Sequence, residues 1–193
     1  YGDWSSDVCS SDLFGKPVEI TAAFEGFRKD YPWKVLATGP AHGIQLKTGR
    51  LVVPVWLSTG TGGHAHRPSV TSTIYSDDAG QTWHAGAIAV PNTPEMINPN
   101  ETVLVELANG GVLLNVRSES LKHRRLITTS PDGATNWSKA EFNDDLLEPI
   151  CMGSTVRLSD AATGGKNRIL FANPDNLKRA DGKEKDGVDR KST

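Results

Sequence analysis

The sequence predicts an all-β protein made of short antiparallel hairpins. Its composition is rich in turn-forming residues, with 19 glycines and 11 prolines among 193 residues, and such a composition suits many short strands better than long helices. From Gly43 onward, short apolar runs alternate with polar turn segments. A helix is only weakly indicated between Pro17 and Arg28, because Gly26 and the β-branched residues there disfavour it.

Five pairs of strands are expected, each joined by a polar or glycine-containing turn. The paired ranges are 44–46 with 51–57, 70–75 with 83–90, 102–107 with 112–117, 126–129 with the stretch after Trp137, and 155–158 with 168–172. The turn at Asn109 and Gly110 is the strongest hairpin signal, because both residue types tolerate a positive φ.

The charge balance and the hydropathy exclude two classes of partner. Lys and Arg total 21 against 23 Asp and Glu, a formal net charge of −2, whereas sequence-blind nucleic-acid binding needs a surplus of clustered cations. The chain has no apolar run of about 18 residues that could span a bilayer. Cys9 and Cys151 form no disulfide framework and lack the spacing of metal ligands. We therefore expect no nucleic-acid partner, no membrane span and no metal.

The two ends of the chain are expected to lie outside the folded domain. Residues 5–7 and 10–12 both read Ser-Ser-Asp, without apolar periodicity. We expect residues 1–13 and 181–193 to be non-native or disordered tails around a domain of residues 14–180. Residues 1–13 and 189–193 resemble translated sequencing-adapter read-through, which would make both ends artificial, and an ordinary disordered tail is the alternative.

A turn motif occurs twice in the predicted hairpins. The first copy is Ser76-x-Asp78-x-Gly80-x-Thr82-Trp83, and the second, degenerate copy is Ser130-x-Asp132-Gly133-x-x-x-Trp137. Asp and Ser side chains accept bonds from backbone N–H groups in a turn, glycine supplies a conformation barred to side chains, and tryptophan packs under the hairpin. The motif therefore predicts a structural role, and its spacing of roughly 50 residues is typical of β-propeller blades.

Longer stretches carry a resemblance to one family. Residues 76–83 form an Asp box, a motif that several β-propellers and secreted modules share. Further matching stretches are residues 38–54, 100–118 and 169–174, in consistent order and spacing. Over about residues 15–180 the chain resembles the sialidase (neuraminidase) family of bacterial type. The resemblance implies a six-bladed β-propeller, of which this chain would be an incomplete fragment of roughly three blades.

The resemblance also implies an activity. It predicts an exo-α-sialidase, a retaining glycosidase that releases terminal sialic acid from sialylated glycoproteins, glycolipids and oligosaccharides without a metal or organic cofactor. An early arginine and the acid/base aspartate are expected upstream of Phe14, and a third arginine and the nucleophilic tyrosine downstream of Thr193, so the fragment alone is expected to be inactive. Tyr1, Tyr31 and Tyr75 do not match the setting of the nucleophile. Bacterial relatives that act on external glycans imply a secreted or periplasmic parent.

Four residues are assigned to the site by this resemblance. Sialic acid carries a carboxylate on its anomeric carbon, so its site needs fixed cations and a nucleophile that this charge does not repel; sialidases use tyrosine. Glu101 would be the base that activates the tyrosine, and Arg117 would bind the sugar carboxylate through its planar fork. Trp56 would line the pocket or pack between blades, and Asn100 would line the pocket.

The hairpin register offers a check that is independent of the family. A two-residue loop at Asn109 and Gly110 would place Glu101 opposite Ser118, on the other face from Arg117. A three-residue loop with a bulge would place Glu101 opposite Arg117. A shared site therefore requires the second register or a break in the strand at Glu101.

Two other functional classes stay open. One is a non-catalytic carbohydrate-binding propeller, which would keep Arg117 for anion binding and need no base at Glu101. The other is an inert fragment with exposed strand edges that invite aggregation. His42, His64 and His66 are expected to face solvent rather than a metal, and the basic run Lys122–Arg125 is expected to be an exposed face.

Overall fold

The computed structural model describes residues 17–161 and 164–175, and the predicted all-β fold is confirmed there. The expected tails, residues 1–13 and 181–193, lie outside the described residues. The elements in chain order are the 3₁₀-helix η1 (Thr21–Lys29) and the strands β1 (Val35–Thr38), β2 (Ile44–Gln45), β3 (Leu51–Ser58), β4 (Ser69–Ser76), β5 (His84–Ala85), β6 (Thr102–Glu106), β7 (Val112–Val116), β8 (Arg124–Ser130), β9 (Glu141–Leu147), β10 (Ser154–Ser159) and β11 (Arg168–Ala172).

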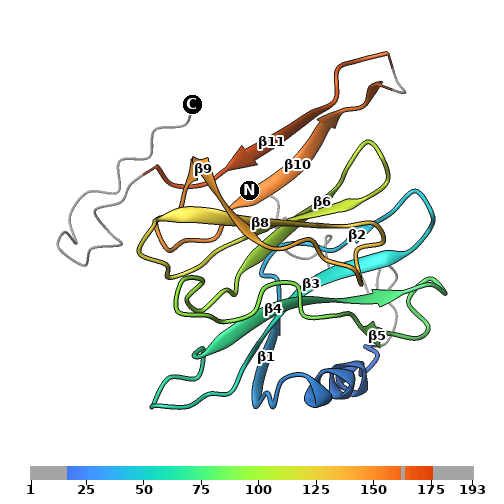
Figure 1. Ribbon diagram of the computed structural model, residues 1–193. Helices are drawn as coiled ribbons and strands as arrows, with labels where there is room; N and C mark the ends of the chain where they lie inside the picture. The colour runs from blue at the N-terminus through green and yellow to red at the C-terminus, as the bar shows by residue number, and fades with distance from the viewer. Residues whose placement is uncertain (1–16, 162–163, 176–193) are drawn as a thin grey trace, which may run out of the picture.

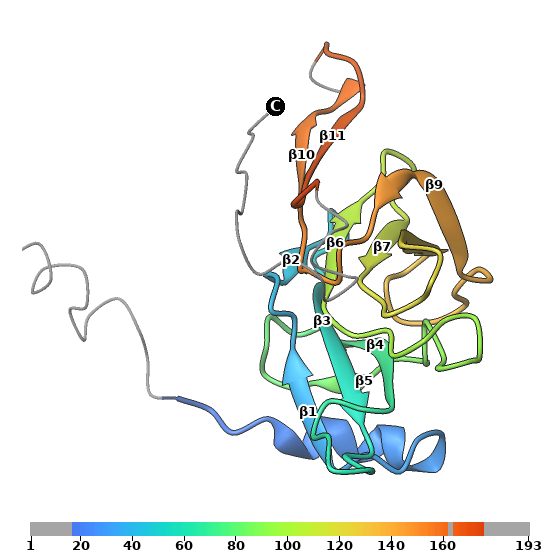
Figure 2. The ribbon, with the colours of Figure 1, turned by 90° about the vertical axis from the view of Figure 1, so that its left-hand side faces the viewer.

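The strands form three antiparallel sheets that follow one another along the chain (Figure 1). The first has the order β1-β3-β4-β5 with β2 also paired to β3, the second is the meander β6-β7-β8-β9, and the third is β10-β11. All five expected hairpin pairings are present. Strand β6 contacts β2 and β3 of the first sheet and β10 of the third. The sheets therefore stack side by side as successive propeller blades (Figure 2).

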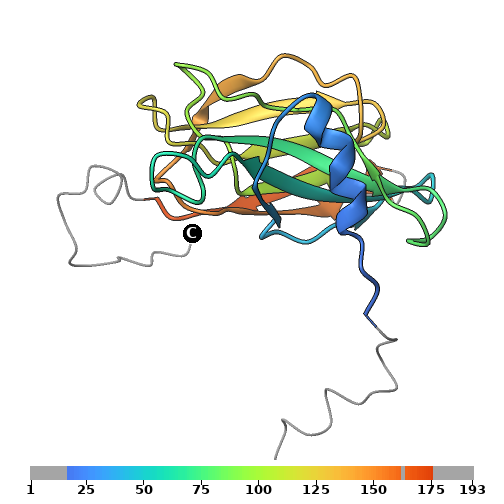
Figure 3. The same cartoon turned by 90° about the horizontal axis from the view of Figure 1, so that it is seen from below.

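Two hydrophobic clusters of buried residues stabilise the first two sheets. One joins Val52 and Val90 of the first sheet region to Leu104, Leu114 and Leu126 of the second sheet. The other lies between η1 and the first sheet, and Figure 3 shows η1 crossing that sheet. On the third sheet, in contrast, four apolar side chains are exposed, namely Val156, Leu158, Ile169 and Leu170.

The weakly indicated helix is present as a 3₁₀-helix. Phe24 and Phe27 are both buried, and a spacing of three residues places them on one face of a helix that has three residues per turn. A Cβ at Gly26 would lie 2.9 Å from the Cβ of Ala85, so glycine permits the close approach of η1 to β5. Within the described ranges, no helix is long and apolar enough to cross a bilayer.

The two Asp-box turns are held by internal hydrogen bonds. In the first, the Asp78 carboxylate accepts bonds from the Thr82 N–H at 2.8 Å and the Thr82 hydroxyl at 2.6 Å, and the Ser76 hydroxyl accepts the Gly80 N–H at 2.8 Å. The bonds from Thr82 are the main cause that lowers the pKa of Asp78 to about 2. The Trp83 indole N–H donates to the carbonyl of Gly80, which closes the turn.

In the second turn, the threonine that bonds the aspartate carboxylate lies three positions after it, one fewer than in the first turn. Burial by itself raises the pKa of Asp132, but bonds from the Thr135 and Ala134 N–H groups and from nearby hydroxyls outweigh it and lower the pKa to about 2. Thr135 thus takes the place that Thr82 has in the first turn. Arg50 connects the two turns, since it forms a bidentate pair with Asp77 and lies 3.2 Å from the carboxylate of Asp132.

Candidate functional site

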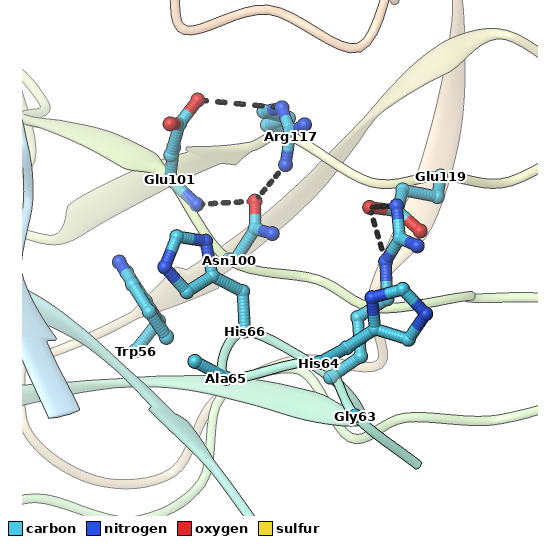
Figure 4. A pocket seen from close by; sticks show the side chains of 10 residues that line it. Trp56, Gly63, His64, Ala65, His66, Asn100, Glu101, Arg117 and Glu119 are labelled. Carbon is cyan, nitrogen blue, oxygen red and sulfur yellow. Dashed lines mark hydrogen bonds and ion pairs between the residues drawn. The ribbon is translucent and has the colours of Figure 1, made fainter. Parts of the chain in front are cut away.

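The four residues that the sequence assigns to the site lie around one hollow. A pocket of about 410 Å³ opens between the end of the β6–β7 hairpin that lies away from its turn and the loop that joins β3 to β4 (Figure 4). Its lining residues are Trp56, Gly63, His64, Ala65, His66, Arg67, Asn100, Glu101, Arg117 and Glu119. The volume falls within the range of ordinary small-molecule sites.

The β6–β7 register is the one that a shared site requires. The Leu107 N–H donates to the carbonyl of Gly111 at 2.6 Å, which leaves a three-residue loop, and Gly110 has a φ of 83°. Val103 pairs with Asn115 in the ladder. Continued to the end of the hairpin, this register places Glu101 opposite Arg117, as the three-residue alternative predicts.

The strand also breaks at the site. The Arg117 N–H donates to the carbonyl of Glu101 at 3.0 Å, but the carbonyl of Arg117 accepts the N–H of Asn100 at 3.1 Å. The N–H of Glu101 turns instead to Oδ1 of Asn100 at 2.6 Å. The same oxygen accepts Nη1 of Arg117 at 2.6 Å. The amide of Asn100 therefore fixes both the backbone of Glu101 and the guanidinium of Arg117.

Glu101 and Arg117 form an ion pair inside the pocket. Nε of Arg117 lies 3.3 Å from Oε2 of Glu101, and the side chains are 14% and 34% exposed for Arg117 and Glu101 respectively. Nε is buried and has no aligned hydrogen-bond acceptor among the described residues. A carboxylate and a guanidinium whose donors are not all satisfied thus share one cavity, which suits the binding of an anion.

The opposite wall is the loop of residues 59–68. The imidazole of His66 lies 5.2 Å, centroid to centroid, from the indole of Trp56, which is itself 7% exposed. Arg67 bonds the carboxylate of Glu119 at 2.8 Å, and Glu119 also accepts Nδ2 of Asn98 at 2.8 Å. These contacts tie the loop to the segment that follows Arg117.

Sequence reasoning did not find this wall. His64 and His66 are exposed, as expected, yet both line the pocket, and Arg67 and Glu119 line it with them. The one local signal is the glycine-rich loop that directly follows the strand of Trp56. In the part of the chain that is described, no group of three or more His, Cys, Asp or Glu side chains could hold a metal ion.

The expectation of an exposed basic run at Lys122–Arg125 is wrong for Arg125. Lys122 is exposed, but the side chain of Arg125 is 0% exposed and lies 2.6 Å from the buried carboxylate of Glu148. Arg125 lies on the face of β8 opposite Leu126 of the hydrophobic core, and it is covered there by Glu148 and the carbonyl of Cys151. The charge pattern alone could not reveal a buried partner 23 positions away.

The fold and the pocket together define a class. Antiparallel sheets stacked in chain order, with Asp-box turns and a carboxylate–guanidinium pair in a pocket, are the architecture of an Asp-box β-propeller protein. A family model described as "BNR repeat-like domain" matches residues 4–180, and the chain belongs to that family.

Proteins named sialidases are among the relatives that this chain matches, which confirms the expected resemblance. The chain is 30% identical over 165 residues to a sialidase of Bacteroides fragilis, covering 84% of this chain and 27% of that protein. Among solved structures, the Hadza microbial sialidase Hz136 matches with a TM-score of 0.59 and 28% identity over 77% of this chain and 27% of that one. Trypanosoma rangeli sialidase in complex with sialic acid matches with a TM-score of 0.54 and 25% identity over 87% and 24%. The chain thus spans about a quarter of the length of these relatives.

Proposed function

We propose that this chain supplies part of the active site of an exo-α-sialidase that releases terminal sialic acid with retention of configuration. The support is the similarity to proteins named sialidases, one of them in complex with sialic acid, together with the pocket around Glu101 and Arg117. The observation that carries the proposal is the convergence of these two side chains, with Asn100 between them, on one cavity.

Arg117 binds the carboxylate of the sugar. Its guanidinium is held by Asn100 through Nη1, so it meets the substrate already oriented. A pre-oriented guanidinium loses less conformational freedom on binding than a mobile one, and it donates parallel bonds to a carboxylate. Because the substrate carries this negative charge at the reacting carbon, a carboxylate nucleophile would be repelled, whereas a tyrosine hydroxyl is neutral until its proton leaves.

Glu101 takes that proton. It is half-exposed at the pocket and lies beside Arg117, so its carboxylate is available to a hydroxyl that enters the cavity. The tyrosine itself is proposed to come from outside the described residues. Tyr31 is engaged by its hydroxyl with the carbonyl of Pro68, and Tyr75 stacks against Arg50 and His84. The chain therefore provides the base and one cation. The nucleophilic tyrosine, the acid/base aspartate and the other two arginines are supplied by the rest of the full-length protein.

The test is hydrolysis of a fluorogenic sialoside by the full-length protein that carries this chain. Glu101→Gln should lower kcat by at least about 100-fold, the low end of general-base contributions. Arg117→Met should raise KM through the lost carboxylate contact. Glu141→Gln, an exposed change on β9, is the matched control and should leave both constants unchanged.

Two outcomes would contradict the proposal. Full activity of Glu101→Gln would exclude its role as the base. Binding of sialic acid that depends on Arg117, with no hydrolysis by the full-length protein, would identify the carbohydrate-binding alternative instead.

A further inference from the structure

A buried ion pair lies beside the candidate site. Arg125 and Glu148 are both 0% exposed, and Nη1 of Arg125 lies 2.6 Å from Oε2 of Glu148. Each guanidinium nitrogen of Arg125 is hydrogen-bonded: Nε bonds Oδ1 of Asn115 at 2.5 Å, Nη2 bonds the carbonyl of Asn115 at 3.1 Å, and Nη1 also bonds the carbonyl of Cys151 at 3.0 Å. A buried pair pays a large desolvation cost, so its presence calls for a reason beyond stability.

The strand register places Arg125 of this pair in one row with two residues that line the pocket. In the β7–β8 ladder Val116 pairs with Leu126, and the next step of the same register brings Arg117 opposite Arg125. Glu101 lies opposite Arg117 on the other side, through the β6–β7 register. Glu101, Arg117 and Arg125 therefore form one row across three strands, on one face of the second sheet. Asn115, which Arg125 binds twice, precedes Arg117 by two residues on that face.

Arg117 and Arg125, two positively charged residues, are thus neighbours in the row. Like charges directly opposite each other in a sheet are unfavourable unless each has its own partner. Here Arg117 has Glu101 and Arg125 has Glu148. Burial lowers the pKa of Arg125 and raises the pKa of Glu148, and the charges of Arg117 and Glu101 also act on Arg125. The four side chains form one electrostatic unit.

We propose that Glu148 and Arg125 are positioning residues for Arg117. Because Glu148 binds the guanidinium of Arg125, Glu101 pairs with Arg117 alone. Without the charge of Glu148, the next carboxylate in the row for Arg125 is Glu101, and the two guanidinium groups compete for it. Arg117 then loses the orientation in which it meets an anionic ligand. The role in substrate binding rests on the proposed function, whereas the effect on the ion pair does not.

The experiment measures the coupling between Glu101 and Arg117 in two backgrounds. Urea unfolding of the chain with Glu101→Gln, Arg117→Met and both changes gives a double-mutant cycle, which is repeated with Glu148→Gln. The coupling, expressed as a ratio of unfolding equilibrium constants, should fall at least about threefold in the Glu148→Gln background. Leu114→Ala is the control background, because it weakens the core on the opposite face without changing a charge. Equal coupling in the Glu148→Gln and wild-type backgrounds would overturn the proposal.

A second set of variants keeps the proposal testable if Glu148→Gln does not fold. Arg125→Met together with Glu148→Met removes both charges, and replacing a whole buried pair by apolar residues is often tolerated. With no competitor in the row, coupling between Glu101 and Arg117 should stay within about twofold of the wild-type value. Glu148→Asp keeps the charge but shortens the side chain, and it should give an intermediate fall. Loss of coupling in the doubly apolar variant, or no fall in Glu148→Asp, would refute the competition between the two guanidinium groups.

Kinetics of the full-length protein separate this inference from the proposed function. If the protein hydrolyses sialosides, Glu148→Gln should raise KM at least about threefold with a smaller change in kcat, because Arg117 acts in binding. A purely structural role would reduce the active fraction, so kcat would fall with KM unchanged, and that result would overturn the positioning role. If the full-length protein hydrolyses no sialoside, the proposed function fails while the coupling measured on the chain still decides the inference.

Discussion

Asp132 should make the stability of the chain depend on pH in the acid range. Its carboxylate accepts bonds from the N–H groups of Ala134 and Thr135 and from the hydroxyls of Ser130 and Thr135, and its pKa is lowered from 3.8 to about 2. At ~1.4 kcal/mol for each pKa unit, that fall corresponds to ~2.5 kcal/mol. The side chain is 39% exposed, and solvent screening reduces the contribution to ~1–2 kcal/mol.

The direction in which the stability changes with pH follows from the linkage between proton binding and folding. The pKa is lower in the folded chain, so the unfolded chain binds more protons between about pH 5 and pH 2. The stabilisation by Asp132 is therefore present above its unfolded pKa and is lost as the pH falls through the folded value. Asp132→Asn removes the charge and should destabilise the chain by ~1–2 kcal/mol at about pH 6, with the difference from wild type vanishing near pH 2.

The assay is urea unfolding followed by tryptophan fluorescence at about pH 6, 4 and 2.5, with wild type and Asp132→Asn compared at each pH. The comparison cancels the parallel contribution of Asp78, which titrates in the same range in both proteins. A difference in unfolding free energy that stays constant across this range would refute the reasoning, because it would show that the charge of Asp132 is not what the turn stabilises.

Three further predictions concern the site and the third sheet. Asn100→Ala leaves the N–H of Glu101 and Nη1 of Arg117, whose bonds to Asn100 are partly buried, without their acceptor and should lower the unfolding free energy by ~1–3 kcal/mol in urea; an unchanged midpoint would contradict this. His66→Ala, an exposed change, should leave stability within ~0.5 kcal/mol but raise KM of the full-length protein for a sialoside, and an unchanged KM would remove the 59–68 wall from substrate contact. The exposed apolar side chains of β10 and β11 predict self-association of the chain. Leu158→Lys with Leu170→Lys should reduce that association in sedimentation velocity, and a monomeric wild-type chain or an unchanged association would contradict the prediction.

The hairpins and the Asp-box turns could be predicted from sequence because their signals are local. A glycine-containing turn between two apolar runs fixes which strands pair, and the motif at Ser76–Trp83 specifies its own hydrogen bonds. The register around Asn109 and Gly110 could be narrowed to two alternatives with opposite consequences for Glu101. The structure contains the alternative that a shared site requires.

What the sequence did not reveal depends on contacts between distant segments. The exposure of His66 was predictable, but its position over Trp56 depends on how the loop of residues 59–68 folds back over β3. Arg125 lies in a basic run, and the contacts with Glu148 and with the carbonyl of Cys151 turn it into a buried group. The 3₁₀-helix was only weakly indicated because its stability comes from packing Phe24 and Phe27 on the first sheet rather than from helix propensity.

The most direct test of the account is a crystal structure of the full-length protein with sialic acid bound. We expect the sugar carboxylate to lie within hydrogen-bond distance of the Arg117 guanidinium, with Glu101 facing the same cavity and Asn100 still bound to both. A sugar bound away from this pocket, or Glu101 and Arg117 turned to opposite faces of the second sheet, would contradict the account.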